Sequence, residues 1–214
     1  DSEILMSVLS RLELGHQAAR YLEDERGLGP SLARAHGIVR ATQSQWDCAV
    51  RRAVGYYGRE AVDQAGLLAA SGRPHPHIER TLVLPYFGPG GPVGLRFRRL
   101  SADATYAGAR YVGRRHAHNS VPAPYLADAS GWPLGASPRR GLLWVVEGEF
   151  DALSLRARGR ASLGVPGARA FSPEWVRSWE GADGVVLLLA ADRDGVAAAE
   201  QLVGSVQRAC EERF

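Results

Sequence analysis

Carboxylates follow two apolar runs in the last third of the sequence, in a pattern that is typical of metal chemistry. Residues 142–146 are all apolar and lead into Glu147, and residues 185–191 form a second apolar run that leads into Asp192 and Asp194. Three carboxylates brought close together repel one another unless a cation lies between them. Hard oxygen ligands favour Mg²⁺ or Mn²⁺ over zinc, and such ions clamp phosphates during phosphoryl transfer.

The elements around these acids predict how the fold brings them together. Buried parallel strands are expected at 142–146, 161–165 and 185–190, alternating with helices at 149–158, from 172 and at 197–212. This order predicts an α/β fold, a small open parallel sheet with flanking helices. Ligands bind such sheets outside the carboxyl ends of the strands, so Glu147, Asp192 and Asp194 are expected to converge there. An acid after a strand also often caps the next helix, and for Glu149 and Asp151 this interpretation stays open.

The first two thirds of the chain have a different organisation. Residues 1–72 show helical apolar spacing, with Gly27, Gly37 and Gly58 where helices would end. Residues 73–140 contain strand patterns at 81–86 and 93–98, separated by a glycine- and proline-rich turn. The second strand alternates apolar and basic residues, which predicts a hairpin with one basic, half-exposed face. We therefore expect an α+β N-terminal lobe over residues 1–140 and a second lobe over residues 141–214.

Charge divides these lobes further. The sequence contains 26 Arg and no Lys. Residues 73–140 carry ten Arg against Glu79, Asp103 and Asp128, a net charge of +7, whereas residues 141–214 carry eight Arg against eleven acids, a net charge of −3. A basic part beside an acidic part suits a protein that holds a polyanion with one and metal ions with the other.

Composition excludes several classes of protein. The 214 residues are 45% hydrophobic and 23% charged, which is typical of a globular chain rather than a disordered one. No apolar run reaches the roughly 18 residues of a membrane-spanning helix. Cys48 and Cys210 cannot form a disulfide framework, and without a Cys-x-x-Cys pair no zinc is expected in this fragment. The sequence begins at Asp1 without a signal-peptide pattern, so we expect a piece of a longer cytoplasmic protein with no membrane partner.

The two acidic segments resemble the two main motifs of Toprim domains, especially those of bacterial and phage DNA primases. Residues 145–153 resemble the first motif, an apolar strand that ends in Glu-Gly and is followed by an Asp. Residues 187–194 resemble the second, a strand that ends in Asp-x-Asp, and residues 161–165 look like the strand-and-glycine segment between them. Further stretches are similar, in the same order, to the N-terminal part of primase cores, at 21–28, 35–38, 65–68, 82–100 and 110–112.

This resemblance implies an activity and a set of residues. It implies a Toprim-type primase catalytic core, a nucleotidyltransferase that synthesises short RNA primers on single-stranded DNA during replication. Glu147, Asp192 and Asp194 would hold Mg²⁺ or Mn²⁺, with Asp151 in support. The basic lobe would hold the template and the ribonucleoside triphosphates, with Arg96, Arg98, Arg99 and Arg110 as candidates by motif, and Arg26, Arg114 and Arg115 as further candidates. A replicative helicase, fused or recruited, is the expected primosome partner.

Two other hypotheses stay open. Toprim sites also occur in nucleases and topoisomerases, in which the same acids assist strand cleavage. In the other hypothesis, the chain is a non-catalytic module that binds single-stranded DNA and has a degenerate Toprim lobe. This last hypothesis rests on two departures from the primase pattern: Gly195 follows Asp194 directly, where primases have two residues in between, and no further acidic motif precedes Phe214.

Overall fold

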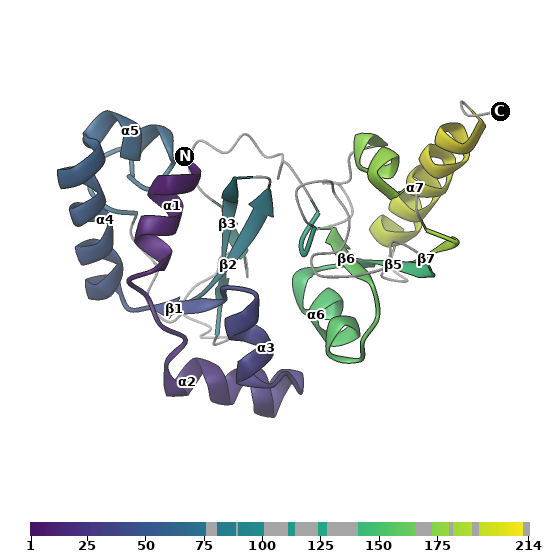
Figure 1. The fold of residues 1–214 in the computed structure, drawn as a ribbon, viewed down its shortest axis with the longest axis horizontal. Helices are drawn as coiled ribbons and strands as arrows, with labels where there is room; N and C mark the ends of the chain where they lie inside the picture. Colours follow the sequence, from purple (N-terminus) through teal and green to yellow (C-terminus); the bar gives the residue numbers. More distant parts are fainter. Residues whose placement is uncertain are drawn as a thin grey trace. The chain divides into compact units, whose positions relative to one another are not determined.

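The chain forms two compact units in the computed structural model, which describes residues 1–75, 81–88, 90–100, 111–113, 124–127, 141–165, 173–179, 182–189 and 193–211 (Figure 1). The first unit contains Asp1–Tyr86 and Gly90–Ser120, and the second contains Phe87–Pro89 and Val121–Phe214. The lobe boundary expected after residue 140 stays a prediction, because residues 128–140 lie outside the described residues.

Helices make up most of residues 1–64 in the first unit, as the apolar spacing predicts. They are α1 (Ser2–Leu9), α2 (Gly15–Arg20), the π-helical turn η1 (Tyr21–Glu25), α3 (Pro30–Ala35), α4 (Gln43–Tyr57) and α5 (Arg59–Gln64). Gly27, Gly37 and Gly58 follow three of these elements with φ angles of +62°, +65° and +85°. A residue with a side chain is strained in this left-handed region, which explains why the helices end at glycine.

A four-stranded sheet completes the first unit, in the order β1 (Val39–Ala41), β2 (Thr81–Gly88), β3 (Gly91–Arg99) and β4 (Tyr111–Gly113). β1 pairs antiparallel with β2, and β4 pairs antiparallel with β3. The β2–β3 hairpin is predicted by the sequence, whereas β1 and β4 are not. Each of these two strands has three residues, which is too short for an alternating pattern to be recognised.

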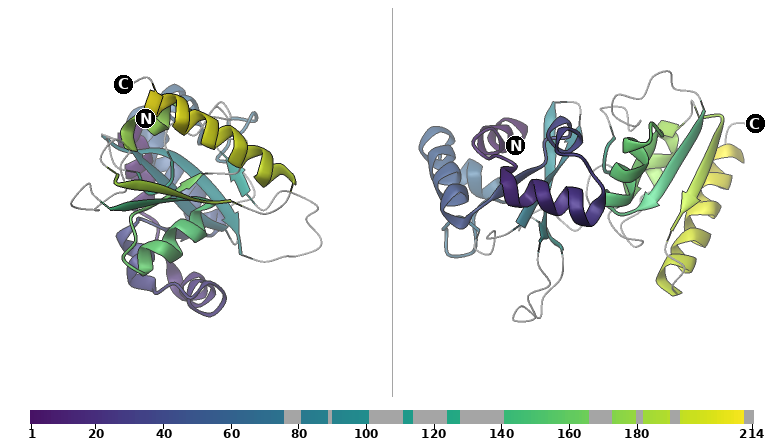
Figure 2. Two further views of the ribbon diagram at one scale, coloured as in Figure 1. Left: turned by 90° about the vertical axis from the view of Figure 1, so that its right-hand side faces the viewer. Right: turned by 90° about the horizontal axis from the view of Figure 1, so that it is seen from below.

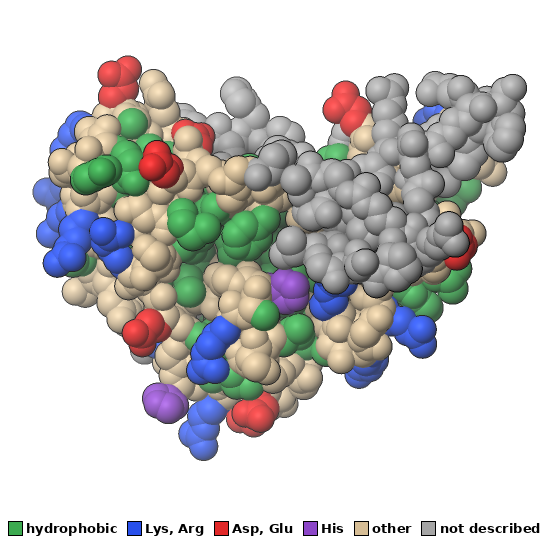
Figure 3. Space-filling model, in the orientation of Figure 1, with side chains coloured by type: hydrophobic (Ala, Val, Ile, Leu, Met, Phe, Trp, Pro, Cys, Tyr) green, Lys and Arg blue, Asp and Glu red, His purple; other side chains and the backbone are tan. Residues whose placement is uncertain are grey.

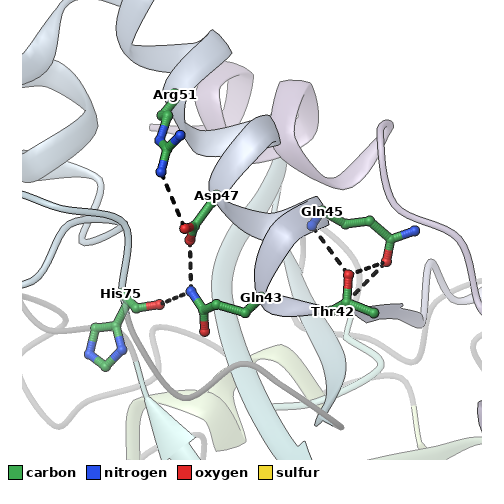
Figure 4. A network of polar contacts seen from close by, with 6 residues as sticks. All are labelled: Thr42, Gln43, Gln45, Asp47, Arg51 and His75. Atoms are coloured by element: carbon green, nitrogen blue, oxygen red, sulfur yellow. Dashed lines mark hydrogen bonds and ion pairs between the residues drawn. The ribbon is translucent and has the colours of Figure 1, made fainter.

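The core of the first unit lies between this sheet and helices α1, α4 and α5. Trp46 of α4 is fully buried, and its ring meets that of Phe97 of β3 edge to face, with 5.3 Å between the ring centres. The start of α4 is fixed by a capping box, in which the Thr42 side chain accepts from the Gln45 amide and the Gln45 side chain accepts from the Thr42 amide (Figure 4). In the same turn, Gln43 Nε2 donates to the His75 carbonyl, so α4 also holds the segment that leads to β2.

The second unit is a parallel sheet covered by helices on both faces. Its elements are β5 (Leu142–Glu147), α6 (Glu149–Ala157), β6 (Ser162–Val165), the 3-10 helix η3 (Pro173–Trp179), β7 (Gly184–Leu188) and α7 (Arg193–Glu211). β5 lies in the centre and pairs parallel with β6 on one side and β7 on the other. Figure 2 shows α6 on one face of the sheet and α7 on the opposite face. The α/β architecture expected from the sequence is confirmed.

Two elements of this unit differ from the prediction. Residues 173–179 form a 3-10 helix, and α7 begins at Arg193 rather than at residue 197. The earlier start has a physical reason, because Asp192 directly before a helix and Asp194 in its first turn are favourable at a helix N-terminus. Within the described part of the chain, no helix combines the length and the hydropathy required to span a bilayer.

Candidate active site

The central strand of the second unit delivers Glu147 to the carboxyl edge of the sheet. Glu147 is the last residue of β5, is half-buried, and lies opposite Val165 of β6 in the register of the two strands. All three strands are parallel, so their carboxyl ends meet at this edge. This is the edge at which open α/β sheets bind ligands. The structure therefore places Glu147 where the sequence predicts it, at the carboxyl edge of the sheet.

The other two predicted metal ligands follow β7. Val146 of β5 pairs with Leu188 of β7, which places Asp192 four positions beyond the last paired residue of its strand. Asp192 lies outside the described residues, and for Asp194 the structure describes the backbone alone. The sequence places Asp194 in a loop after the strand, but it lies in the first turn of α7. An acid there also interacts favourably with the helix dipole, so helix stabilisation is a second explanation of Asp194.

A glycine turn holds Glu147 in place. Gly148 has a φ angle of +104°, which side chains rarely tolerate, and it turns the chain from β5 into α6 within a single residue. Its amide donates to the Val165 carbonyl at 2.9 Å, so the turn is tied to β6. Asp151 is exposed, and its Oδ2 lies 3.5 Å from the point where a Cβ on Gly148 would stand. Asp151 therefore lies beside the turn that presents Glu147, and its supporting role stays a prediction.

A second glycine allows β6 to approach this turn closely. A Cβ on Gly164 would lie 2.8 Å from the Gly148 carbonyl oxygen, 3.2 Å from Cβ of Tyr125 and 3.3 Å from Cβ of Ala152. Real Cβ atoms essentially never come within 3.0 Å of another heavy atom, so no side chain fits at residue 164 in this arrangement. Gly164 thus determines how closely β6 packs against the turn that follows Glu147.

The segment 124–127 packs against the same glycine, and sequence reasoning missed it. Tyr125 and Gly164 exchange two backbone hydrogen bonds, with N–O distances of 2.7 and 3.0 Å, so the segment adds a short antiparallel bridge to β6. All four of its residues are buried, and Leu126 has a φ angle of +66°. A left-handed leucine costs about 1–3 kcal/mol, which its surroundings must offset. The signal in the sequence was a short apolar run within a region predicted to be loop.

Glu149 is a further acid whose environment differs from the expectation. The sequence leaves it as a possible helix cap, but it is the first residue of α6 and only 1% exposed. The available signal was periodicity, because Glu149 lies on the same helical face as the buried Ala152 and Leu153.

In the last turn of the same helix, burial lowers the pKa of the Arg156 guanidinium below its ordinary value. Arg156 remains protonated at neutral pH and favours the helix C-terminus.

The arginines predicted to bind nucleic acid have differing environments. Arg96 and Arg99 of β3 are half-buried, but Arg98 is only 8% exposed, which corrects the prediction of a half-exposed basic face. The reason is that β3 is an inner strand, with β4 paired along it and Tyr111 opposite Arg98. Arg26 is half-buried at the end of η1, where its Nε and Nη2 donate to the Tyr21 hydroxyl at 3.0 and 2.9 Å. The remaining candidates, Arg110, Arg114 and Arg115, lie outside the described residues.

Comparison with other proteins identifies the fold. Protein-family models and curated protein sequences give no match, but solved structures do. The catalytic domain of a DnaG primase bound to single-stranded DNA has a TM-score of 0.74 at 20% sequence identity, covering 95% of this chain and 65% of that one. The chain has the fold of the DnaG primase catalytic core. A DNA primase domain from Pseudomonas aeruginosa matches with a TM-score of 0.70 at 18% identity, over 96% of this chain and 66% of its own length.

The primase fold extends through both units of the chain. The RNA polymerase domain of the Mycobacterium tuberculosis primase DnaG is a further match, with a TM-score of 0.64 and 21% identity over 94% of this chain and 70% of that one. The recognition of a primase core from the two acidic motifs is therefore confirmed at the level of the fold. The chain spans 65% and 66% of the first two primase domains named above.

Proposed function

We propose that this chain is the catalytic core of a DNA primase, which synthesises short RNA primers on single-stranded DNA by metal-dependent nucleotidyl transfer. The observation that carries the proposal is the primase fold over 95% of the chain. Since one fold can host many functions, the site has to support the proposal as well. It does so through Glu147, which ends the central strand at the ligand-binding edge, and through Asp192, which follows the neighbouring strand β7 in the sequence.

Mg²⁺ or Mn²⁺ is the cofactor that we propose for this edge. Glu147 and Asp192 are the proposed ligands with Asp194 as a third and Asp151 in support, and their carboxylate oxygens are the donors that these ions prefer. Among the described residues no group of three metal-ligating side chains occurs, and the side chains of Asp192 and Asp194 are not among them. When bound, the ion would clamp the triphosphate and activate the primer 3′-hydroxyl.

The arginines of β3 are the proposed binding residues for the template and the incoming triphosphates. Arg96 and Arg99 retain part of their surface, so their guanidinium groups are the proposed direct phosphate contacts. The buried Arg98 would act mainly by raising the positive potential of the strand. Phosphate contacts of this kind bind without regard to sequence and weaken with salt. Arg26, Arg110, Arg114 and Arg115 remain proposed contributors to the same surface.

The proposed partners follow from this activity. A solved neighbour with the same fold is described as bound to single-stranded DNA. For this chain we infer a single-stranded DNA template, ribonucleoside triphosphates and a replicative helicase, fused or recruited. Work on a replication template implies the cytoplasm of a bacterial cell, or of a cell that carries a phage or plasmid.

Primer synthesis on single-stranded DNA tests the proposal. Labelled ribonucleotides with Mg²⁺ or Mn²⁺ are supplied to the wild type and to Glu147→Ala and Asp192→Ala, with Glu174→Ala as the control for removal of an exposed acid in the same unit. We expect short RNA from the wild type and the control, no product from the two site variants, and little change in DNA binding. Full synthesis by both site variants would refute the proposed site, and DNA binding without synthesis by the wild type would refute the activity.

The same proteins distinguish the alternative hypotheses. Nicking of plasmid DNA that requires divalent metal but no nucleotide would indicate Toprim-type strand cleavage. Salt-sensitive DNA binding that ignores metal, in a wild type that neither polymerises nor cleaves, would indicate a non-catalytic binding module. An acid in the first turn of α7 is also explained by the helix dipole, so the substitutions of Glu147 and Asp192 are the clearer tests of the acidic site.

A further inference from the structure

The outer face of helix α4 carries side chains that the core does not explain. The helix buries Trp46, Ala49, Val50 and Ala53 against the first unit. On its opposite side it exposes Arg51, Arg52 and Tyr56, and Arg59 follows at the start of α5. We call these four residues the α4 outer face. Figure 3 shows arginine side chains gathered at the left edge of the view, over α4 and α5.

Tyr56 is an aromatic side chain held in the open. It is 82% exposed, which is unusual for a ring with so much apolar surface. The neighbouring Tyr57 is partly buried against the core, and the two rings stand edge to face with 4.7 Å between their centres. Tyr57 therefore supports the ring of Tyr56 from one side. The rest of the Tyr56 ring remains accessible to solvent. An exposed ring of this kind is a stacking platform for a nucleic-acid base.

A glycine lies in the middle of this face without a structural reason. Gly55 is exposed near the end of a helix of 15 residues, where glycine lowers helix stability relative to alanine. Among the described residues, no atom lies within 4 Å of the Cβ that an alanine would carry there, so their packing does not require the glycine. Arg51 and Arg52 precede it by one helical turn, and Tyr56 follows it directly. Because Gly55 has no side chain, a ligand can approach the helix backbone closely at this position.

The arginines near Gly55 can contact a phosphate group. Arg51 is 72% exposed and pairs with Asp47 at 3.4 Å, as Figure 4 shows, and an exposed pair of this kind is weak enough to be exchanged for a phosphate contact. Within the described residues, Arg52 forms no ion pair with a carboxylate. Nη1 of Arg59 donates to the Gly72 carbonyl at 2.8 Å, which fixes the guanidinium at the end of the α4 outer face.

We propose that the α4 outer face binds single-stranded DNA, with one base stacked on Tyr56 and the sugar–phosphate backbone crossing Gly55 between Arg51 and Arg52. The inference rests on the proposed function, because it gives the template a second contact on the first unit, away from β3. Basic residues interleaved with an exposed aromatic are the pattern by which proteins bind single strands without sequence preference. A duplex, whose bases are already stacked, would use the arginines but not Tyr56.

Photocrosslinking tests the location directly. An oligothymidylate that carries 5-iodouracil is irradiated with the full chain, and the crosslinked peptide is identified by mass spectrometry. We expect a crosslink to Tyr56 that an excess of unlabelled oligothymidylate removes and that duplex DNA of equal length removes far less. Crosslinks confined to the peptides of β3, with none on α4, would overturn the proposal.

Affinity measurements with three substitutions test the roles. Tyr56→Ala should weaken binding of an oligothymidylate by about tenfold, whereas Tyr56→Phe, which keeps the ring, should bind like the wild type. Arg52→Ala should lower the slope of log affinity against log salt by about 0.7, and Arg34→Ala, which removes an exposed arginine from α3, should leave it unchanged. Gly55→Ala should raise the unfolding midpoint and still weaken binding, a combination that a purely structural role of this helix would not produce.

The outcomes separate this inference from the proposed function. If the wild type binds single-stranded DNA and the Tyr56, Arg52 and Gly55 variants bind it equally well, the α4 site is refuted while the primase proposal stands. If the wild type binds no single-stranded DNA at low salt, both are refuted. Equal loss of binding to single-stranded and double-stranded DNA in Tyr56→Ala would also overturn the stacking role.

Discussion

Replacing Gly164 by alanine tests how closely β6 must pack against the turn that presents Glu147. The new Cβ would lie 2.8 Å from the Gly148 carbonyl oxygen, and ordinary contact begins at 3.4 Å, so one backbone has to retreat by roughly 0.6 Å. Tyr125 and Ala152 lie at 3.2 and 3.3 Å on the other sides, which leaves little room for β6 to move instead. The Gly148 turn, and with it Glu147, is therefore the part that shifts.

Gly164→Ala is expected to affect both the stability of the protein and the rate of primer synthesis. Overpacking of this sort costs about 1–3 kcal/mol, which is less than the usual stability of a domain, so the variant should remain folded. A shift of a catalytic group by about 1 Å costs up to a hundredfold in rate, so a shift of roughly half that should cost on the order of tenfold. We therefore expect Gly164→Ala to synthesise primers about tenfold more slowly while it retains its fold and its affinity for DNA.

Urea unfolding and primer synthesis, measured on the same preparation, check this prediction. Gly204→Ala is the matched control, because this glycine lies inside α7 of the same unit and its Cβ would meet only the flexible end of Arg208, at 3.6 Å. The control should gain about 0.5–1 kcal/mol and keep its activity. The reasoning fails if Gly164→Ala retains wild-type synthesis, or if its activity falls only in proportion to the unfolded fraction.

Three further predictions concern the residues Thr42, Trp46 and Glu149. Thr42→Ala removes the capping box of α4 and should lower the free energy of unfolding by about 1 kcal/mol in urea titrations, whereas Thr42→Ser should preserve it. Trp46→Ala empties the space beside Phe97 and should cost about 3–5 kcal/mol, and a smaller loss would mean that the core collapses around it. Glu149→Ala should lower the unfolding midpoint more than Asp151→Ala, since Glu149 is 1% exposed and Asp151 is exposed, while Asp151→Ala should act mainly on primer synthesis. Equal midpoints for these last two variants would contradict the burial of Glu149.

Continuous apolar runs were sufficient to predict the strands that precede Glu147 and Asp192. Leu142–Glu147 and Gly184–Leu188 are strands as expected, because continuous apolar runs between glycines suit a sheet that is covered on both faces. Glu147 could therefore be placed at the sheet edge from the sequence. The sequence did not show that Asp194 lies within α7, since an acid after a strand and an acid at the start of a helix look alike in sequence.

Features that depend on tertiary pairing were not predictable in this way. Arg98 reads as exposed because it alternates with apolar residues, but it is only 8% exposed on an inner strand of the sheet. The segment 124–127 carries no periodicity and joins β6 only through backbone hydrogen bonds. Gly164 reads as an ordinary strand glycine until the positions of Gly148 and Tyr125 are known. These contacts join residues that are far apart in the chain, and local patterns do not record them.

Helix α1 has a consequence for how the protein is made. Its apolar face is buried in the first unit, and Ser2 donates to the carbonyl of Pro92, a residue 90 positions later in the chain. At about 5–20 residues per second of synthesis, this partner leaves the ribosome roughly 5–18 s after α1 does. During that interval Ile4, Leu5, Val8 and Leu9 have no sheet to cover them. Helix α1 is thus a segment that a nascent-chain chaperone would cover until β3 has paired.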